Sequence, residues 1–348
     1  MEQVFENTAI AFELKTDSQL ERAYFLFKMI ANEPLVRIGT AVTNFAINAH
    51  LPVEGLIRAT VFDHFCGGVN EEDCMPIIDK MYTKGVCSIL DYSVEGKKEE
   101  EQFDLTKDKI LNVLEFVKEK KAIPFAVFKP TGFGRIDLYK KIGEKLELSK
   151  KENEEWKRVV NRYEEVCKRA SLLDVALLID AEESWMQDAA DDLILELMRK
   201  YNKEKTIVYT TMQMYRCDRL KYIKNIHAIG LKENFRIGVK VVRGAYMEKE
   251  NERAKEQGIK SPICKSKKES DENFDAAICF MVSNLDVFSI FAGTHNEVSS
   301  YYLMHLLEQN NIKINDSRVW FGQLFGMSDH ISYNLAARGY NVAKYLPY

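Results

Sequence analysis

Two cations, a glycine and a tyrosine follow one another closely in the stretch VKVVRGAYMEKE, residues 239–250. Lys240 and Arg243 flank two valines, and Gly244, Ala245 and Tyr246 come next. Lysine and arginine bind anions through charge-assisted hydrogen bonds, and glycine lets a ligand approach the backbone closely. The stretch therefore predicts that an anionic group is recognised at the end of a buried strand.

Other polar side chains also follow short apolar runs. They are Asp91 and Tyr92; Lys129; Asp180 with Glu182 and Glu183; Gln213 with Tyr215; Thr294, His295 and Asn296; Gln323; and Tyr345 with Tyr348. The hydroxyl, imidazole and amide of the THN stretch suit phosphate oxygens. The sequence contains neither GxGxxG nor GxxxxGK[ST], so a dinucleotide would be held without a Rossmann or P-loop fold, and phosphoryl transfer is not expected.

Each of these residues has a simpler interpretation when it is taken alone. Asp180 could cap the next helix, Lys129 could be a surface lysine, Tyr345 a rim aromatic, Gln213 a solvated amide and His295 an inert loop histidine. The convergence of all of them at strand ends favours the functional interpretation.

The elements that would position these residues alternate regularly from Gly85 onward. Eight apolar runs, VCSILDY, PFAVFK, VALLID, TIVYTT, GVKVVRG, VFSIFAG, RVWFGQL and NVAKYLPY, are separated by segments with one apolar helical stripe. Continuous apolar strands are typical of a parallel sheet covered by helices on both faces. Eight such units over about 260 residues favour a closed (β/α)8 barrel, an α/β fold, over an open doubly wound sheet, and a barrel carries its site at the strand ends.

Two other regions are expected to be helical. Residues 1–84 are predicted to form a helical arm, with Leu20 to Ile30 behind an Asp17/Ser18 cap, a second pattern from Leu35 to Ala49, and a break at FDHFCGG. Residues 85–348 are predicted to form the barrel. The charged insertion 134–174 predicts one or two long helices with solvated faces.

The composition limits the partners. The 348 residues are 46% hydrophobic and 29% charged, with a net charge of -4, so a nucleic-acid partner is not expected. The acidic amino terminus lacks the features of a signal peptide, and no window reaches a membrane-spanning length. We expect a reducing compartment, in which the seven scattered cysteines are small buried side chains and bind no metal.

As a set, LLIDAEES, VKVVRGAYMEKE, FAGTHNE, FGQLFGMSDHIS and KYLPY resemble the proline dehydrogenase family. Members of that family are flavoenzymes that use FAD to oxidise L-proline to 1-pyrroline-5-carboxylate. The resemblance covers about residues 85–348, and the arm with FDHFCGG resembles the monofunctional branch.

The resemblance implies a role for each strand-end residue. The implied FAD-binding residues are Gln213, Lys240, Val242, Gly244, Ala245, Tyr246, Lys267, Thr294, His295, Asn296 and Gln323. Lys240 would lie near N5 of the flavin, where a cation stabilises the reduced ring, and Lys267 would reach the phosphate or adenine end unless it is a solvated lysine among lysines. On the substrate side, Lys129 would face the proline carboxylate and Asp180 would order the basic residues, while Tyr345 and Leu324 would wall the pyrrolidine ring.

The resemblance also implies a quinone as electron acceptor, and peripheral contact with the membrane that holds it. We expect a cytoplasmic protein, peripheral on the inner membrane, or on the matrix side of the mitochondrial membrane in a eukaryote. The family continues after YLPY into a final helix with paired arginines that clamp the substrate carboxylate. This sequence stops at Tyr348, so the last barrel helix is expected to be missing and proline to bind weakly.

Three alternatives remain open from the sequence. The first is a flavin-binding barrel that is inactive or regulatory. The second is another flavin barrel reductase, of the folate-reductase type, which would use NADH. The third is an aldolase with Lys129 or Lys240 as its Schiff-base lysine.

Overall fold

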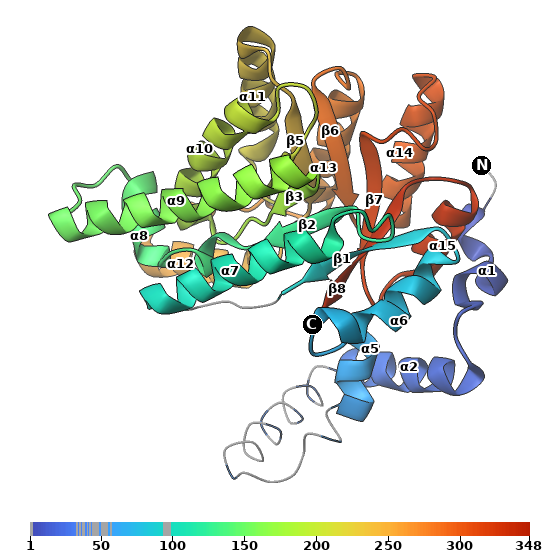
Figure 1. The fold of residues 1–348 in the computed structure, drawn as a ribbon. Helices are drawn as coiled ribbons and strands as arrows, with labels where there is room; N and C mark the ends of the chain where they lie inside the picture. The colour runs from blue at the N-terminus through green and yellow to red at the C-terminus, as the bar shows by residue number, and fades with distance from the viewer. Residues whose placement is uncertain are drawn as a thin grey trace.

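The computed structural model describes residues 3–32, 58–92 and 99–348, with scattered positions between 33 and 57. Its centre is a closed barrel of eight parallel strands in the order of the chain, β1 to β8 (Figure 1). The strands are β1 (Val86–Asp91), β2 (Phe125–Phe128), β3 (Ala176–Ile179), β4 (Val208–Gln213), β5 (Ile237–Val242), β6 (Phe288–Gly293), β7 (Val319–Leu324) and β8 (Val342–Pro347). Each strand overlaps one of the eight apolar runs of the sequence, so the predicted barrel is confirmed.

Side chains alternate between the two faces of each strand, and this alternation separates core from site. In β5, Val239 and Val241 pack outward into the large core under the helices, whereas Lys240 and Val242 line a cavity inside the barrel mouth. In β8, Tyr345 faces inward and the neighbouring Lys344 is buried on the other face.

The barrel interior below the mouth is filled by aromatic rings. Phe125 makes edge-to-face contacts with Tyr209, Phe291 and Trp320 at centroid distances of 5.8, 5.4 and 5.2 Å. Phe291 in turn lies 6.0 Å from the ring of Tyr345. The barrel is therefore a packed core with an open upper end rather than a pore.

Helices surround the barrel. Those that follow the strands are α7 (Glu100–Val117), α8 (Ile136–Gly143), α9 (Lys150–Leu173), α10 (Ser184–Tyr201), α11 (Arg219–Glu233), α12 (Met247–Gln257), α13 (Lys267–Val282), α14 (Glu297–Gln309) and α15 (Asp329–Ala337), with the short turn η3 (Pro130–Gly132) after β2. The insertion 134–174 forms α8 and the 24-residue α9, which runs beside α7 in Figure 1, so the prediction of one or two long helices is confirmed. The apolar stripe predicted after the sixth run comprises Val298, Leu303 and Leu306; Leu303 and Leu306 are buried on α14, but Val298 is 71% exposed, so its place in the stripe is wrong.

Short helices precede the barrel. They are η1 (Val4–Glu6), α1 (Thr8–Phe12), α2 (Asp17–Ile30), the π-helical turn η2 (Arg58–Phe62), α5 (Asp63–Phe65) and α6 (Glu71–Tyr82). Val4 and Phe5 of η1 and Cys74, Ile78 and Met81 of α6 join the core of the barrel.

The predicted helix from Leu20 to Ile30 is present as α2, but its start differs from the prediction. Thr16 is the N-cap, in a capping box with Gln19, rather than Asp17 or Ser18. No α2 residue is buried, and Tyr24 is 71% exposed. The second predicted pattern, Leu35 to Ala49, lies outside the described residues except at isolated positions.

The cysteines only partly match the expectation of burial. Cys74, Cys87 and Cys167 are buried, whereas Cys66, Cys264 and Cys279 are half-buried and Cys217 is exposed. Within the described part of the chain, we find no helix that is both long and apolar enough to cross a bilayer. The same residues contain no group of three His, Cys, Asp or Glu side chains arranged to hold a metal ion.

Candidate active site

A cavity of about 760 Å³ opens at the carboxyl ends of the barrel strands, and every strand or the residue after it contributes to its lining. All fifteen residues predicted from the sequence to form the site line this cavity: Lys129, Asp180, Gln213, Lys240, Val242, Gly244, Ala245, Tyr246, Lys267, Thr294, His295, Asn296, Gln323, Leu324 and Tyr345. Ligand cavities typically measure about 300–1,000 Å³, so this one has room for a large ligand. These fifteen residues therefore converge on one mouth, whereas Tyr92, Glu182, Glu183, Tyr215 and Tyr348, which also follow apolar runs, do not line the cavity.

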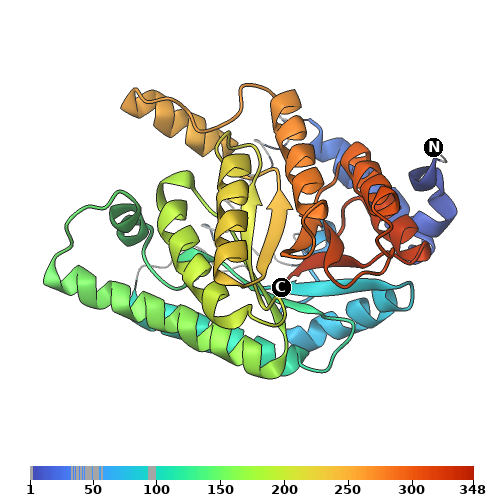
Figure 2. The same cartoon turned by 90° about the horizontal axis from the view of Figure 1, so that it is seen from above.

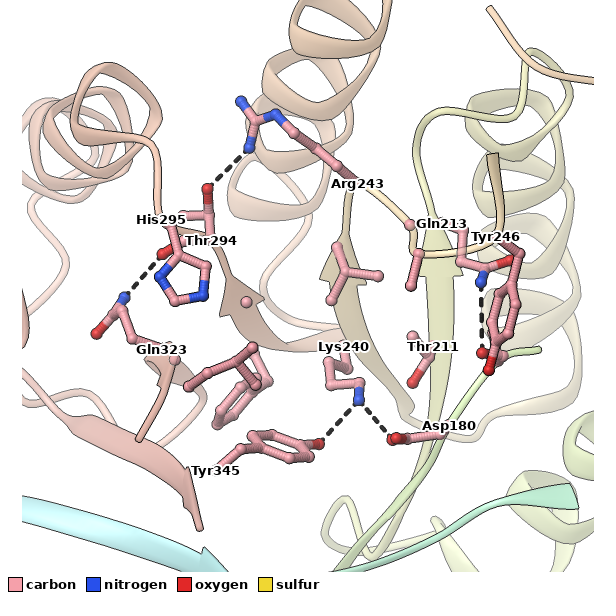
Figure 3. Close-up of a pocket in the computed structure, with 18 of the residues that line it drawn as sticks. Asp180, Thr211, Gln213, Lys240, Arg243, Tyr246, Thr294, His295, Gln323 and Tyr345 are labelled. Atoms are coloured by element: carbon pink, nitrogen blue, oxygen red, sulfur yellow. Dashed lines mark hydrogen bonds and ion pairs between the residues drawn. The ribbon is translucent and has the colours of Figure 1, made fainter. Parts of the chain in front are cut away.

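Lys240 lies at the centre of the cavity floor. Its ammonium donates to Asp180 Oδ1 at 2.5 Å and to the hydroxyl of Tyr345 at 2.8 Å (Figure 3). Lys240 is 6% exposed and Tyr345 7%, and burial together with the nearby carboxylates raises the pKa of the Tyr345 phenol well above its usual value. The N-cap of α10 is Glu183, so the interpretation of Asp180 as a helix cap is wrong.

Lys129 lies next to this group. Its ammonium is 3.5 Å from Asp91 and 3.8 Å from Asp180, and its side chain is 13% exposed. Burial raises the pKa of the Asp91 carboxyl, and the negative charge of Asp180 adds to this shift while the Lys129 ammonium opposes it. Two ammonium groups and two carboxyl groups thus form one cluster, and the interpretation of Lys129 as a surface lysine is wrong.

Two glutamines line the walls. Gln213 is 3% exposed; its amide donates to the carbonyl of Ala181 at 3.3 Å, while its Oε1 atom is buried with no hydrogen-bond partner. Gln323 is fixed at both ends, because its amide donates to the Thr294 carbonyl at 3.0 Å and its Oε1 atom accepts from Ser332 at 2.8 Å. Gln213 is therefore not a solvated amide, and its free acceptor is available to a ligand donor.

Arg243 connects four elements at the rim. Its guanidinium donates to Asp271 at 2.6 Å, to the Thr294 hydroxyl at 2.8 Å and to the Ser299 hydroxyl at 2.9 Å, and it lies over the ring of Phe274 at 4.4 Å. Its charge reaches the cavity, but its hydrogen bonds hold β5, β6, α13 and α14 together.

Gly244 allows the chain to turn after β5. Its φ of +128° is a conformation that side chains rarely adopt, and a Cβ atom there would lie 2.4 Å from the ring of Tyr215. Only glycine fits this position, and Ala245 and Tyr246 are thereby brought to the cavity edge.

The THN stretch leads into the amino terminus of α14. The Thr294 hydroxyl accepts from the Asn296 backbone at 3.1 Å, and the Asn296 side chain caps the helix by accepting from Ser299 N. Helix amino termini favour anions. His295 is exposed and shares a 2.9 Å hydrogen bond with Ser328. Desolvation of the ring by the surrounding protein, with the charges of Lys344 and His330, lowers its pKa to about 4.

Lys267 occupies the outer edge of the cavity. Its side chain is 79% exposed and pairs with Asp271 at 2.7 Å. This geometry is closer to the solvated lysine than to a buried phosphate ligand.

Several lining residues escaped the sequence prediction. The sequence predicts Asp91 only as a strand-end residue without a role, and it makes no prediction for Thr211 or Phe291, yet all three line the cavity. The period of two along a strand could have found Thr211, which lies two residues before Gln213 on the same face. No local signal marks Ser328 as the partner of His295.

These groups fit a flavin dinucleotide, the cofactor that the sequence resemblance implies. Gln213 Oε1 is a buried acceptor without a partner, Lys240 places a cation in the floor, and α14 presents its amino terminus beside Thr294 and Asn296. The donor set therefore matches a ligand with a polar ring at one end and phosphates at the other.

Comparison with known proteins agrees with this arrangement. The family model described as Proline dehydrogenase matches residues 74–348. The carbapenem antibiotics biosynthesis protein CarD of Pectobacterium carotovorum subsp. carotovorum is 32% identical over 85% of this chain and 76% of its own length. Mitochondrial proline dehydrogenase 1 is 27% identical in Arabidopsis thaliana, over 95% of this chain and 76% of that protein, and 26% in Dictyostelium discoideum, over 85% and 59%.

Solved structures share the fold. Proline utilization A (PutA) from Bdellovibrio bacteriovorus, inactivated by N-propargylglycine, superposes with a TM-score of 0.72 at 18% identity, covering 99% of this chain and 34% of that one. The D778Y mutant of PutA from Bradyrhizobium japonicum gives a TM-score of 0.67 at 18% identity, over 90% and 31%. The chain thus spans about a third of the length of these PutA proteins.

Proposed function

The chain belongs to the proline dehydrogenase family, and from this premise we propose that it oxidises L-proline to 1-pyrroline-5-carboxylate with FAD and passes the electrons to a quinone. The observation that carries the proposal is the buried ammonium of Lys240, held between Asp180 and Tyr345 in the floor of the cavity. A cation fixed there would stabilise negative charge gathered on a ring system above it.

The residues divide between cofactor and substrate. Gln213, the backbone of Val242 and Gly244, and the THN stretch at α14 would hold FAD, which accepts a hydride when it is bound. Lys267 would assist at the outer end of the cofactor, where its exposed side chain can reach a phosphate.

On the substrate side, Lys129 would bind the proline carboxylate. Its ammonium lies 3.5 Å from Asp91 and 3.8 Å from Asp180 and lines the same cavity as Lys240, so it places a second positive charge beside the proposed substrate position. Tyr345 and Leu324 would contact the apolar ring, and the packed Phe291 below them excludes water from that side.

The ammonium groups of Lys129 and Lys240 would also affect the protonation of the ring nitrogen of proline. An amine gives up a hydride from the neighbouring carbon only when it is unprotonated, and nearby cations disfavour a further positive charge. The ammonium groups of Lys129 and Lys240 would therefore favour the neutral amine, while fixed contacts hold the ring in position.

The test is to reconstitute the purified protein with FAD and add L-proline without oxygen, following the visible spectrum. We expect the flavin absorbance to fall, the product to be trapped as its o-aminobenzaldehyde adduct, and a short-chain quinone to restore the oxidised spectrum. Bound flavin that proline leaves oxidised would indicate an inactive or regulatory barrel. Reduction by NADH alone would indicate a reductase, and borohydride trapping of a keto substrate without flavin would indicate an aldolase.

A further inference from the structure

Two cysteines lie on adjacent backbone segments beside the cavity. One segment follows β4, and the other, residues 258–266, joins α12 to α13, where Figure 2 shows α12 standing away from the barrel. Arg216 and Ile263 form an isolated antiparallel bridge. Around it, Cys217 N donates to the carbonyl of Pro262 at 3.0 Å, and Cys264 N donates to the carbonyl of Tyr215 at 2.6 Å.

This bridge places the two thiols on one face. Residues on either side of a bridged pair point to the face opposite that pair, so Cys217 and Cys264 are diagonal neighbours across the two segments. Diagonal neighbours have Cα atoms about 7–8 Å apart, and a disulfide usually spans at most about 6.8 Å. A shift of about one ångström between the segments would therefore suffice for a bond.

The two thiols differ in access. Cys217 is exposed and Cys264 is half-buried. Burial and the adjacent Cys217 thiol raise the pKa of Cys264 to about 11. Cys217 is therefore the group that an oxidant in solution meets first, and Cys264 is placed to react second.

We propose that Cys217 and Cys264 form a reversible disulfide that ties residues 258–266 to the end of β4. The oxidant is a low-molecular-mass disulfide such as glutathione disulfide. The Cys217 thiolate attacks one of its sulfurs and releases one thiolate; Cys264 then loses its proton, attacks the Cys217 sulfur and releases the second. Two electrons pass from the cysteine pair to the oxidant.

The bond would restrain the rim of the cavity. Residues 258–266 lead directly into α13, which carries Lys267 at the cavity edge and, one turn later, Asp271 as a partner of Arg243. Ile259 and Lys260 within the segment are exposed, so a cross-link would reduce the local motion of the segment. The disulfide requires neither FAD nor proline, and its failure is therefore distinguishable from failure of the proposed function.

The experiment uses the unmodified full chain in glutathione redox buffers of increasing oxidising strength. Free thiols are blocked with N-ethylmaleimide, and the peptides are mapped by mass spectrometry before and after reduction. We expect a peptide pair linked through Cys217 and Cys264, lighter by two hydrogens, which dithiothreitol separates. If both cysteines carry N-ethylmaleimide or separate glutathione adducts at the strongest oxidising buffer, the proposal is wrong.

Limited trypsin digestion gives an independent readout on the segment. Lys260 and Lys265 are exposed cleavage sites, and we expect oxidation to slow cleavage there by at least about fivefold, because a cross-link suppresses local opening. Cys217→Ser should abolish this protection, whereas Cys279→Ser, which alters a half-buried thiol on α13, should retain it. Equal cleavage of oxidised and reduced protein would overturn the proposed restraint.

Discussion

The ammonium of Lys240 lies 2.5 Å from Oδ1 of Asp180, so a side chain of β5 and the residue that follows β3 are joined across the mouth of the barrel. The two side chains are 7% and 14% exposed. A charge pair in such surroundings is weakly screened by solvent, and removal of one partner leaves the other buried and unpaired. Asp180 therefore determines where the positive charge of Lys240 resides.

Asp180→Ala should lower kcat/KM for proline by about 30- to 150-fold, the equivalent of about 2–3 kcal/mol for losing one partner of a buried charge pair. We expect most of the effect in KM, because Lys129 also loses a neighbouring carboxylate. Steady-state kinetics per bound flavin provide the measurement. Asp137→Ala, at an exposed carboxylate on α8, is the matched control, and an unchanged proline dependence in Asp180→Ala would remove this residue from the site.

Lys240→Met should lower the reduction potential of the bound flavin, because the cation that stabilises the reduced ring is lost. A loss of about 1.4–2.8 kcal/mol corresponds to about 30–60 mV for a two-electron couple. Spectroelectrochemistry with reference dyes measures the shift, and Lys240→Arg should recover most of it by restoring the charge. A potential equal to that of the unmodified protein would place the flavin ring elsewhere.

Much of the architecture could be predicted because its causes are local. Continuous apolar runs such as VALLID and TIVYTT require burial on both faces, and the eight repeats leave few topologies other than a barrel. The site residues followed from the same logic, since a residue just after a buried strand is carried to the mouth. The resemblance implied that Asp180 orders basic residues of the site, but its direct bond to Lys240 is seen only in the structure.

Features that depend on contacts across the chain could not be predicted. The N-cap of α2 is decided by which neighbouring side chain, Thr16 or Asp17, bonds the backbone. Cys217 N donates to the carbonyl of Pro262, 45 residues further along, beside the bridge between Arg216 and Ile263. His295 bonds Ser328, which lies after the next strand. Such pairings are fixed by tertiary packing, and the periodicity of a sequence carries no information about contacts between distant residues.

Lys129→Met should weaken proline binding selectively through the carboxylate. Hydrogen bonds to charged groups contribute about 1.5–3 kcal/mol, so we expect kcat/KM for proline to fall by about 10- to 150-fold. Pyrrolidine has the same ring without the carboxylate, and its turnover should change little. Comparison of the two substrates in the variant and in Lys121→Met, an exposed control, measures the role. A parallel loss with both substrates would assign Lys129 to the fold instead.

His295 should make the folding stability of the protein fall at acid pH. Its pKa falls from 6.5 to about 4 on folding, so between these values the unfolded state binds more protons and stability rises with pH. The contribution is present above pH about 6.5 and is lost as the pH falls toward 4. In urea unfolding of the flavin-free protein, the free energy of unfolding should therefore fall less steeply between pH 6.5 and 4 in His295→Asn than in the unmodified protein. Ser328→Ala, which removes the hydrogen-bond partner but keeps the imidazole, should retain the slope of the unmodified protein; identical slopes in all three would contradict the assignment.

Lys344 should be a strong stabilising residue although it lies outside the cavity. It is fully buried, pairs with Asp329 at 2.7 Å, and donates to the carbonyls of Met327 at 2.6 Å and Leu324 at 3.3 Å. Burial lowers the pKa of its ammonium, and Asp329 opposes that shift. Lys344→Met would leave an 11% exposed carboxylate with Lys15 at 4.0 Å as its remaining ion-pair partner among the described residues.

Breaking a buried pair in this way costs about 3–5 kcal/mol, and we expect the free energy of unfolding in Lys344→Met to fall by that amount. Lys313→Met, at an exposed lysine, is the matched control for the loss of charge. In the double variant Lys344→Met/Asp329→Asn no carboxylate is left unpaired, so part of the loss should be recovered. Equal urea midpoints for Lys344→Met and Lys313→Met would show that the pair does not hold the turn between β7 and α15. The single variant Asp329→Asn is measured beside the double variant. If the double variant loses the full sum of the two single losses in unfolding free energy, the cost comes from the lost hydrogen bonds to the Met327 and Leu324 carbonyls and not from an unpaired Asp329.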